Sequence, residues 1–355
     1  MQANFRKLSV ILITQMVVLF STCIRETSAQ SNKETSTDST FQNPLLPGGA
    51  DPWVIEKDGV YYYMSTNGGN ISIWKTSAIT EVGHVKPVVV WQPPASGVHS
   101  RNIWAPELHY LQGKWYLYYS AGSSSNLATQ RVFVLENNAA DPTRGTWIDK
   151  GEIRDIVANH FSIDGSVFQY KHKWYFIWSG TASDTDNIQR IYIAEMKNPW
   201  TLKTHRIQIS MPQYQWEKIG GQVNEGPEAL INPAGDLFIT FSVSQCSTDD
   251  YGLGILRLKA GGNPLDPADW IKNPVPVFSK SIQHKVFGPG HNGFFQSKDG
   301  KENWIIYHAN AESGQGCGGA RNPRIQKFTW NADGSPNFGE PVSTSQKIKK
   351  PSGEY

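Results

Sequence analysis

The sequence GKWYLYYS at residues 113–120 is the clearest copy of a segment that the chain repeats five times. Each copy is a short run of aromatic and β-branched residues after a polar or glycine turn, which is typical of a strand leaving a hairpin. The first large residues of successive copies lie 54, 59, 63 and 67 positions apart. A period slightly above about 50 residues indicates radial β repetition rather than a helical solenoid. The other copies are GVYYYMST at 59–66, HKWYFIWS at 172–179, GDLFITFS at 235–242 and NWIIYH at 303–308.

Five repeats of about four strands each predict an all-β chain that folds as a five-bladed β-propeller. The 32 Gly and 21 Pro residues punctuate the whole chain of 355 residues, and no stretch between them keeps a helical period. A β-sandwich, or two separate all-β domains, is the alternative. Because the repeats run evenly from residue 48 to 340 without a linker, we expect a single propeller domain at 43–350.

The N-terminus has the composition of an export signal. Arg6 and Lys7 precede an apolar run at 8–20, and small residues follow up to Ala29, so residues 1–29 are predicted to be a signal peptide. The run is too short for a stable membrane span, and residues 30–42 are expected to form a flexible linker. We therefore expect a secreted or periplasmic protein. Cys23 lies in a sequence that loosely resembles a bacterial lipobox, which leaves an outer-membrane lipoprotein as the alternative.

The charge balance argues against a nucleic-acid partner. Outside residues 1–29 the chain carries 30 basic and 30 acidic side chains, because that leader contains three of the 33 basic and one of the 31 acidic residues. Aromatic residues make up 12% of the chain. Since aromatic faces stack on the C–H faces of sugars, we expect a carbohydrate ligand. We also expect the protein to be a monomer.

Two cysteines remain if Cys23 leaves with the leader. Cys246 and Cys317 each follow the repeated strand of adjoining blades, so their loops should lie on the same face, near the pocket. In an exported protein such a pair is predicted to form a disulfide. A buried free thiol is the alternative, whereas a zinc site would need a nearby His pair.

A second regularity places one polar residue 8 to 13 positions before the first large residue of each repeated strand. Equivalent positions on successive blades are related by rotation about the central axis, so these side chains are expected to converge on one funnel. Converging carboxylates suggest glycoside hydrolysis by an acid and a base, since like charges keep one carboxyl protonated near neutrality. The five residues are Asp51, Glu107, Asp164, Glu225 and His291.

Several motifs resemble glycoside hydrolase family 43, over nearly the whole mature chain and in the family's order. They are ADPWV at 50–54, IWAPELH at 103–109, SIDGSVF at 162–168, EGPEAL at 225–230, GPGHNGFF at 288–295 and ARNPRIQKFTWNADGSPNFGEPV at 320–342. The resemblance implies a five-bladed propeller and single-displacement hydrolysis with inversion. It also implies that Asp51 is the general base, that Glu225 is the general acid, and that Asp164 tunes the pKa of the acid and orients the substrate.

The same resemblance implies binding residues. Arg321, rather than Arg324, is expected to orient the substrate, with surface ion pairs as the alternative for both. His291 is expected beside the substrate and near a structural calcium or sodium ion on the axis, or else hydrogen-bonded in the core. No cofactor is expected for the chemistry itself. Trp104 is expected to line the sugar pocket as a stacking face, whereas Glu107 would hydrogen-bond the start of its strand.

The opening GGADPWV and the segment GPGHNGF look most like the α-L-arabinofuranosidases of the family. We therefore expect release of terminal α-L-arabinofuranosyl residues from arabinan or arabinoxylan. A β-D-xylosidase or an endo-arabinanase of the same family is the alternative. A non-catalytic sugar-binding propeller is the alternative from another class, but it would not need an acid and a base on different blades.

Overall fold

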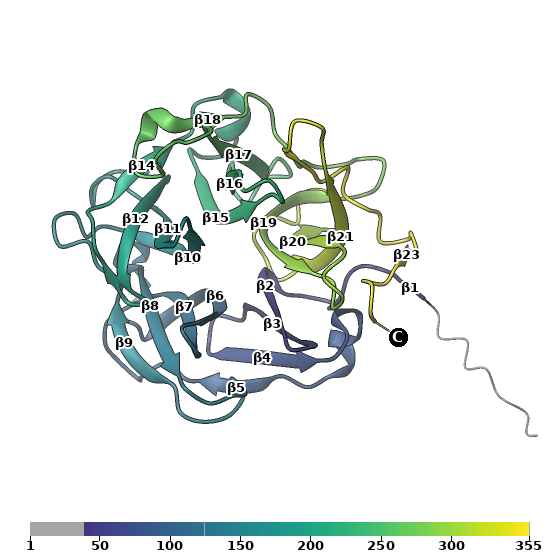
Figure 1. Cartoon of the computed structure of the whole chain (residues 1–355), viewed down its shortest axis with the longest axis horizontal. Coiled ribbons are helices and arrows are strands. Elements are labelled where there is room, and N and C mark those ends of the chain that lie inside the picture. Colours follow the sequence, from purple (N-terminus) through teal and green to yellow (C-terminus); the bar gives the residue numbers. More distant parts are fainter. Residues whose placement is uncertain (1–38, 124, 355) are drawn as a thin grey trace, which may run out of the picture. The chain divides into compact units, whose positions relative to one another are not determined.

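The strands of the computed structural model, which describes residues 39–123 and 125–354, form five sheets around a central axis (Figure 1). Each of these sheets is antiparallel and contains strands that are consecutive in the sequence, so one sequence repeat makes one blade. This arrangement confirms the predicted five-bladed β-propeller. No helix in the described part of the chain is long and apolar enough to cross a bilayer.

The innermost strand of each blade comes first in its repeat, and the repeated aromatic segment is the second strand. Blades 1 to 3 consist of β2 (Ala50–Lys57), β3 (Val60–Thr66), β4 (Ile71–Thr76) and β5 (Val88–Trp91); β6 (Arg101–Leu111), β7 (Lys114–Gly122), β8 (Arg131–Asn137) and β9 (Ile148–Glu152); and β10 (Ser162–Tyr170), β11 (Lys173–Gly180), β12 (Arg190–Asn198), β13 (Thr201–Leu202) and β14 (Ile207–Ser210). Blades 4 and 5 consist of β15 (Asn224–Ile231), β16 (Leu237–Val243), β17 (Gly252–Leu258) and β18 (Trp270–Lys272); and β19 (Phe287–Gln296), β20 (Asn303–Asn310), β21 (Asn322–Trp330) and β22 (Pro336–Asn337).

The ends of the propeller domain differ slightly from the expected boundaries. The predicted signal peptide 1–29, Cys23 and residues 30–38 of the expected linker lie outside the described residues. The end of that linker is structured, because β1 (Thr40–Phe41) pairs with β23 (Ile348–Lys349). Past residue 350, the carboxylate of Glu354 accepts hydrogen bonds from the backbone N–H groups of Ile79 and Thr80.

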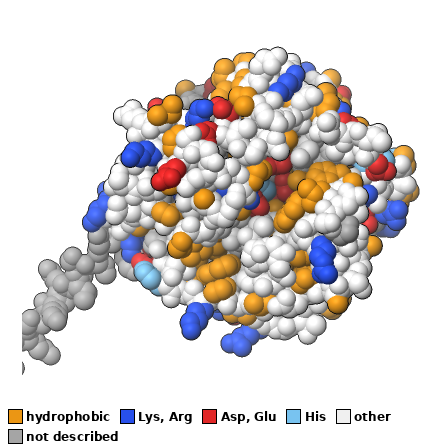
Figure 2. Space-filling view, turned by 180° about the vertical axis from the view of Figure 1, so that it is seen from behind, with side chains coloured by type: hydrophobic (Ala, Val, Ile, Leu, Met, Phe, Trp, Pro, Cys, Tyr) orange, Lys and Arg blue, Asp and Glu red, His pale blue; other side chains and the backbone are white. Residues whose placement is uncertain are grey.

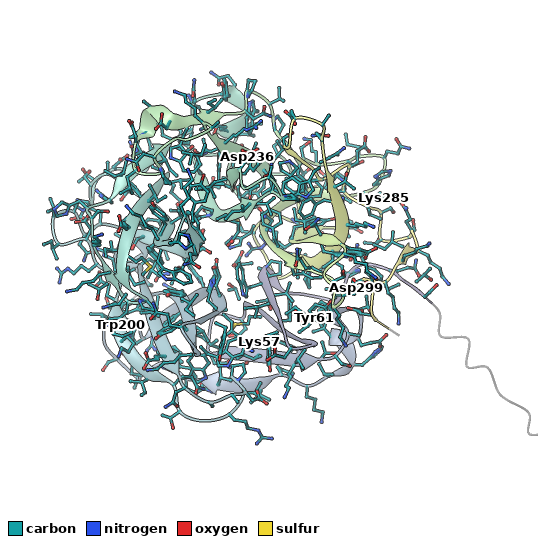
Figure 3. The ribbon with its side chains drawn as sticks, viewed as in Figure 1. Lys57, Tyr61, Trp200, Asp236, Lys285 and Asp299 are labelled. Carbon is teal, nitrogen blue, oxygen red and sulfur yellow. A yellow bond between two sulfur atoms is a disulfide. The ribbon has the colours of Figure 1, made fainter. Side chains whose placement is uncertain are left out.

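Five apolar cores fill the spaces between neighbouring blades. The second strand of each blade has neighbours on both faces, which explains its continuous apolar run in place of an alternating pattern. All seven residues of β16 are buried, for example. Side chains occupy the gaps between sheets (Figure 3), where Tyr61 of β3 meets Phe295 of the fifth blade edge to face, with ring centroids 5.8 Å apart.

A β-bulge recurs at the same place in all five innermost strands. Two residues of the inner strand face one residue of the second strand, and the first of the two has a left-handed backbone. Such a conformation costs free energy for residues other than glycine, and it redirects the side chain toward the axis. The five left-handed residues are Asp51 (φ 52°), Ala105 (φ 42°), Asp164 (φ 54°), Gly226 (φ 53°) and His291 (φ 48°).

This register corrects the expectation that five polar residues share one position. Asp51, Asp164 and His291 do share it, but Glu225 lies one residue before the left-handed position and Glu107 lies two residues after it. The physical reason is the bulge. Consecutive residues there can all approach the axis, so polarity alone does not identify the equivalent position.

Contacts between blades 5 and 1 close the ring, because among the described residues no blade contains strands from both ends of the chain. The N–H of Asp51 donates to Nδ1 of His308 (3.1 Å), and the N–H of Gly49 donates to the carbonyl of Arg321 (3.0 Å). The buried amide of Asn43 adds two bonds to the backbone of Ile325, at 2.9 and 3.0 Å. The segment that precedes β2 is therefore fastened to β21.

Replacing Asn43 with alanine is expected to lower the free energy of unfolding by about 2–4 kcal/mol, because a buried N–H and C=O of Ile325 lose their partners. Urea denaturation followed by tryptophan fluorescence measures this loss. Gln42→Ala is the matched control, since the Gln42 amide binds backbone carbonyls at the exposed surface. Equal stability of both variants would contradict this account of ring closure.

Candidate active site

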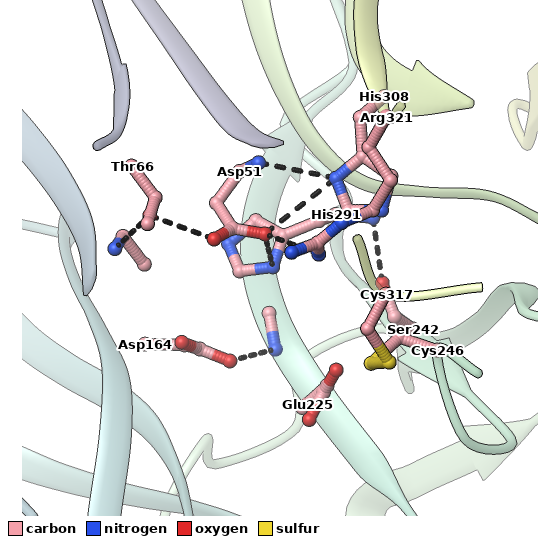
Figure 4. A network of polar contacts seen from close by, with 12 residues as sticks. Asp51, Thr66, Asp164, Glu225, Ser242, Cys246, His291, His308, Cys317 and Arg321 are labelled. Carbon is pink, nitrogen blue, oxygen red and sulfur yellow. Dashed lines mark hydrogen bonds and ion pairs between the residues drawn. A yellow bond between two sulfur atoms is a disulfide. The ribbon is translucent and has the colours of Figure 1, made fainter. Parts of the chain in front are cut away.

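The molecule is hollowed at its centre on the face seen from behind, and acidic side chains and histidine lie within the hollow (Figure 2). Hydrophobic side chains border it. The left-handed bulges point toward this region, so the side chains around it come from different blades. The structure brings together Asp51, Asp164, Glu225, His291 and Arg321, five of the residues selected from the sequence (Figure 4).

Asp51 is surrounded by groups that stabilise its negative charge. Its Oδ1 lies 3.3 Å from Nδ1 of His291 and 3.3 Å from a guanidinium nitrogen of Arg321, while the hydroxyl of Thr66 donates to Oδ2 at 2.7 Å. Burial opposes ionisation, but these neighbours outweigh it and lower the pKa of Asp51 to about 2. Asp51 is therefore an ionised carboxylate at any working pH.

His308 lies behind Asp51 and is neutral. Burial and the nearby Arg321 lower the pKa of His308 well below its ordinary value. Its Nδ1 accepts the backbone N–H of Asp51, so the ring proton resides on Nε2. The 3.5 Å approach of Nδ1 to Oδ1 of Asp51 is then a contact between two acceptors and not an ion pair.

Asp164 has the opposite environment. Its side chain is buried, and burial together with the charges of Glu225 and Asp51 raises the pKa of Asp164 to about 7, although His291 opposes this. Its Oδ2 accepts the backbone N–H of Gly226 at 2.9 Å, and its own N–H donates to Ser120. Asp164 thus contacts the residue directly after Glu225.

Glu225 also keeps its proton more readily than a carboxyl in water. Burial and the charge of Asp51 raise the pKa of Glu225, against the opposing effects of His291, Arg321 and the hydroxyl of Tyr251, which donates to Oε1 at 2.8 Å. Gly290 leaves room for the Tyr251 ring, since a Cβ at Gly290 would lie 2.4 Å from Cε1 of that ring. Two carboxyls with raised pKa values thus lie near one with a lowered pKa.

The carboxylates around His291 favour its protonated form. Burial opposes this charge, but Asp51, Asp164 and Glu225 outweigh burial and raise the pKa of His291. The described residues contain no group of three or more His, Cys, Asp or Glu side chains that could hold a metal ion. A protonated His291 does not fit a ligand of calcium or sodium, so we derive no step through a metal. The expected axial ion stays a prediction.

Arg321 and Arg324 have different surroundings. Arg321 contacts Asp51, and its Nε also donates to the carbonyl of Gly318 at 3.4 Å. Arg324 is fully buried, and its Nε donates to the side chain of Asn322 at 2.8 Å. Arg321 is thus the one of the two that contacts Asp51, whereas Arg324 is buried away from the surface; the role of Arg321 in orienting the substrate stays a prediction.

The expected disulfide is present between Cys246 and Cys317, with their Cα atoms 5.1 Å apart. It joins the loop after β16 to the loop before β21, beside the charged cluster (Figure 4). Gly318, which follows Cys317, is the residue whose carbonyl binds Arg321. The disulfide therefore supports the segment from which Arg321 reaches Asp51.

Trp104 is half-buried and occupies the same bulge position as Glu225, one residue before the left-handed residue of its blade. Its role as a stacking face stays a prediction. Glu107 lies two residues past the left-handed residue of its strand, and its buried side chain contacts Nε2 of His109 at 2.9 Å. We expected Glu107 to hydrogen-bond the start of its strand, but its side chain contacts the His109 ring instead.

Sequence reasoning missed Tyr251, Thr66 and the role of His308. The signal for His308 was available, because it ends the fifth repeat where Thr66, Ser120, Ser179 and Ser242 end the others. Tyr251 gave no comparable signal, since its loop does not repeat.

A cavity of about 390 Å³ lies at the other ends of β2, β15 and β19, lined by residues such as Ile55, Ile231 and Phe294. It contains none of the charged groups described above. We therefore place the candidate site in the hollow and not in this cavity.

The chain is similar to known proteins over most of its length. Residues 41–336 match the sequence model of "Glycosyl hydrolases family 43". The chain is 38% identical over 346 residues to an "Extracellular exo-alpha-(1->5)-L-arabinofuranosidase" of Streptomyces avermitilis, covering 95% of this chain and 71% of that protein. A protein of the same name from Streptomyces chartreusis is 38% identical over 273 residues, covering 76% and 82%. The crystal structure of an alpha-L-arabinofuranosidase from Lactobacillus brevis superposes with a TM-score of 0.81 at 34% identity, over 86% of this chain and 98% of that one.

Removing the disulfide by the double substitution Cys246→Ser and Cys317→Ser is expected to cost about 2–4 kcal/mol in the free energy of unfolding. The reason is that the bond closes a separation of 71 residues in the unfolded chain. Urea denaturation with and without reductant measures the loss. Reductant should destabilise the wild type and leave the double variant unchanged; a wild type insensitive to reductant would refute the prediction.

Proposed function

The chain belongs to glycosyl hydrolases family 43, and we propose that it is an exo-acting α-L-arabinofuranosidase that hydrolyses with inversion. It is a glycoside hydrolase, and its proposed substrates are arabinan- or arabinoxylan-type polysaccharides or their oligosaccharides. The observation that carries the proposal is the axial set of one ionised and two proton-retaining carboxyls, on three different blades. The names of the relatives support the choice of sugar and exo action.

In the proposed reaction Asp51 is the general base. The oxygen of a water forms a bond to the anomeric carbon while Asp51 takes a proton from that water. Thr66, His291 and Arg321 fix the orientation of the Asp51 carboxylate and keep it ionised, so it is ready to accept a proton at any working pH. Its lowered pKa means that position, more than intrinsic basicity, must provide its catalytic effect.

Glu225 is the proposed general acid. As the bond between the anomeric carbon and the leaving oxygen breaks, Glu225 gives its proton to that oxygen. Its raised pKa favours retention of this proton. Glu225 precedes a bulge glycine, whose amide is held by Asp164, and its carboxyl is held by Tyr251.

Asp164 is the proposed tuner of the acid. Its carboxyl and that of Glu225 influence each other's ionisation, so the two compete for protons and titrate as a set. The amide of Gly226 stabilises the ionised form of Asp164, which favours the proton on Glu225. The same bond positions the backbone of the acid.

Three further residues are proposed to bind the substrate. Arg321 and His291 flank the base and can donate hydrogen bonds to sugar hydroxyls. Trp104, half-buried in the position equivalent to Glu225, is proposed to stack on the sugar. We also propose that the protein acts as a monomer outside the cytoplasm, freely secreted or periplasmic, or tethered through Cys23; the relatives' names support an extracellular site.

A panel of para-nitrophenyl glycosides tests this function against its alternatives. We expect hydrolysis of the α-L-arabinofuranoside, whereas preference for the β-D-xyloside would indicate the xylosidase alternative. Linear arabinan should release arabinose, and longer products would indicate an endo-arabinanase. Sugar binding without turnover of any glycoside would identify a non-catalytic propeller.

Substitution of the acid should depend on the leaving group. Glu225→Ala is expected to reduce turnover of natural arabino-oligosaccharides by about 10²–10⁴-fold but that of activated aryl arabinosides far less, because a good leaving group needs little protonation. Asp51→Ala should damage both substrates equally, since water must be activated in each case. Steady-state kinetics on both substrates, with circular dichroism to confirm folding, measures the difference. Equal losses for Glu225→Ala would make it a binding residue.

Substitution of the tuner should move the pH profile. The wild type is expected to lose activity as the pH rises through the pKa values of the Asp164–Glu225 set, because the acid then loses its proton. Asp164→Asn removes a neighbouring negative charge, so the pKa of Glu225 falls and the alkaline limb of kcat/KM moves to lower pH. The control is Asp141→Asn, whose carboxylate pairs with Lys75 and accepts hydrogen bonds from Thr143 outside the charged cluster. An unchanged or raised alkaline limb in Asp164→Asn would remove Asp164 from this role.

A further inference from the structure

A second ring of residues surrounds the axis beneath the catalytic carboxyls. It is formed by the residues two positions after the left-handed bulge residue on each blade. Two contacts show that these positions meet. The hydroxyl of Ser166 donates to Oε2 of Glu228 at 3.3 Å, and a Cβ on Gly293 would lie 3.3 Å from Cε3 of Trp53. The ring consists of Trp53, Glu107, Ser166, Glu228 and Gly293.

Two carboxyl groups meet in this second ring. Glu107 and Glu228 come from blades 2 and 4, are 4% and 5% exposed, and are hydrogen-bonded to each other. A hydrogen bond between two carboxyls requires a proton on one of them. Within the described residues neither forms an ion pair with Lys or Arg, so no such cation could hold both ionised.

The neighbours of the pair decide which carboxyl holds the proton. Nε2 of His109 lies 2.9 Å from Oε2 of Glu107 and can donate to it, so Glu107 has a hydrogen-bond donor besides its partner. The His109 ring is held by Trp53, with ring centroids 4.8 Å apart. Glu228 has only the Ser166 hydroxyl besides its partner, and burial together with the charge of Glu107 raises the pKa of Glu228 well above its ordinary value. The proton therefore resides on Glu228.

We propose that Glu107 and Glu228 share one proton, and that the single negative charge, held on Glu107, makes them positioning residues that set the protonation of the catalytic layer above. This inference rests on the proposed function. The titratable groups that face the pair are His109 on β6, Tyr118 on β7, Asp164 on β10 and His291 on β19.

The path of influence runs through His291 and Asp164. The charge of Glu107 helps to raise the pKa of His291, and the protonated ring contacts Oδ1 of Asp51. Asp164 interacts electrostatically with Glu228, so a full charge on Glu228 would disfavour ionisation of Asp164 in turn. A proton on Glu228 limits the pair of Glu107 and Glu228 to one negative charge. Asp164 and Glu225 can then still share a proton between them.

Two isosteric variants test the proposal through the pH dependence of kcat/KM on an aryl arabinoside. Glu228→Gln mimics the protonated carboxyl, so kcat and the alkaline limb should stay within about twofold and about 0.2 pH unit of the wild type. Glu107→Gln removes the charge that favours protonation of His291, and a weaker cation at His291 raises the pKa values of Asp164 and Glu225. The alkaline limb should therefore move to higher pH by about 0.5–1 unit with little change in KM. The double variant should reproduce the shift of Glu107→Gln. A merely structural pair would lose stability in both variants without a selective shift, and an unmoved limb in Glu107→Gln would overturn the proposal.

A measurement without substrate separates this proposal from the proposed function. In protein with ¹³C-labelled glutamate side chains at pH 7, the carboxyl spectrum should contain a protonated glutamate that Glu228→Gln removes and Glu107→Gln retains. If no aryl arabinoside is hydrolysed, the proposed function fails while this spectrum still tests the pair. If Glu107→Gln does not fold, the wild type and Glu228→Gln suffice. A spectrum in which Glu228→Gln removes no protonated resonance refutes the shared proton.

Discussion

The structure depends on one repeated hydrogen bond between neighbouring blades. In four of the five blades, the left-handed bulge residue of the inner strand donates its N–H to a polar side chain near the end of the second strand of the preceding blade. Asp51 bonds His308, Ala105 bonds Thr66, Asp164 bonds Ser120 and His291 bonds Ser242. Because this bond holds the backbone in a conformation that a free chain disfavours, it fixes both the spacing of the blades and the direction of the side chains at the axis.

The fourth blade departs from the pattern at the point where the chemistry is proposed to occur. The N–H of Gly226 bonds the carboxylate of Asp164, and Ser179 instead bonds the carbonyl of Asn224. A packing bond between blades has thus been replaced by a bond between the proposed tuner and the backbone of the proposed acid. Position and protonation of Glu225 are therefore linked through the same carboxyl.

Neighbouring cations, and not burial alone, decide which of the carboxyls at the axis is ionised. Asp51 is stabilised by Arg321 and protonated His291, whereas Glu225 and Asp164 lack an ion pair of their own among the described residues. Burial raises the pKa of all three, but only for Asp51 do neighbours reverse the effect. A propeller makes this possible because each blade contributes one short stretch of backbone to the axis, so adjacent positions can differ in charge without altering the fold.

The sequence by itself determined the five repeats, the propeller, the carboxylates and the disulfide partners, because strands buried on both faces must be apolar and must recur once per blade. It did not determine the register at the axis. Glu107 and Glu225 read as equivalents of Asp51, yet the bulges place Glu107 in a deeper ring and Glu225 beside a glycine. The roles of Tyr251 and His308, and the pairing of Glu107 with Glu228, were likewise decided only by tertiary structure. The physical reason is that ionisation depends on burial and on charges contributed by other blades, and these neighbours are separated along the chain by up to 270 residues, as for Arg321 and Asp51.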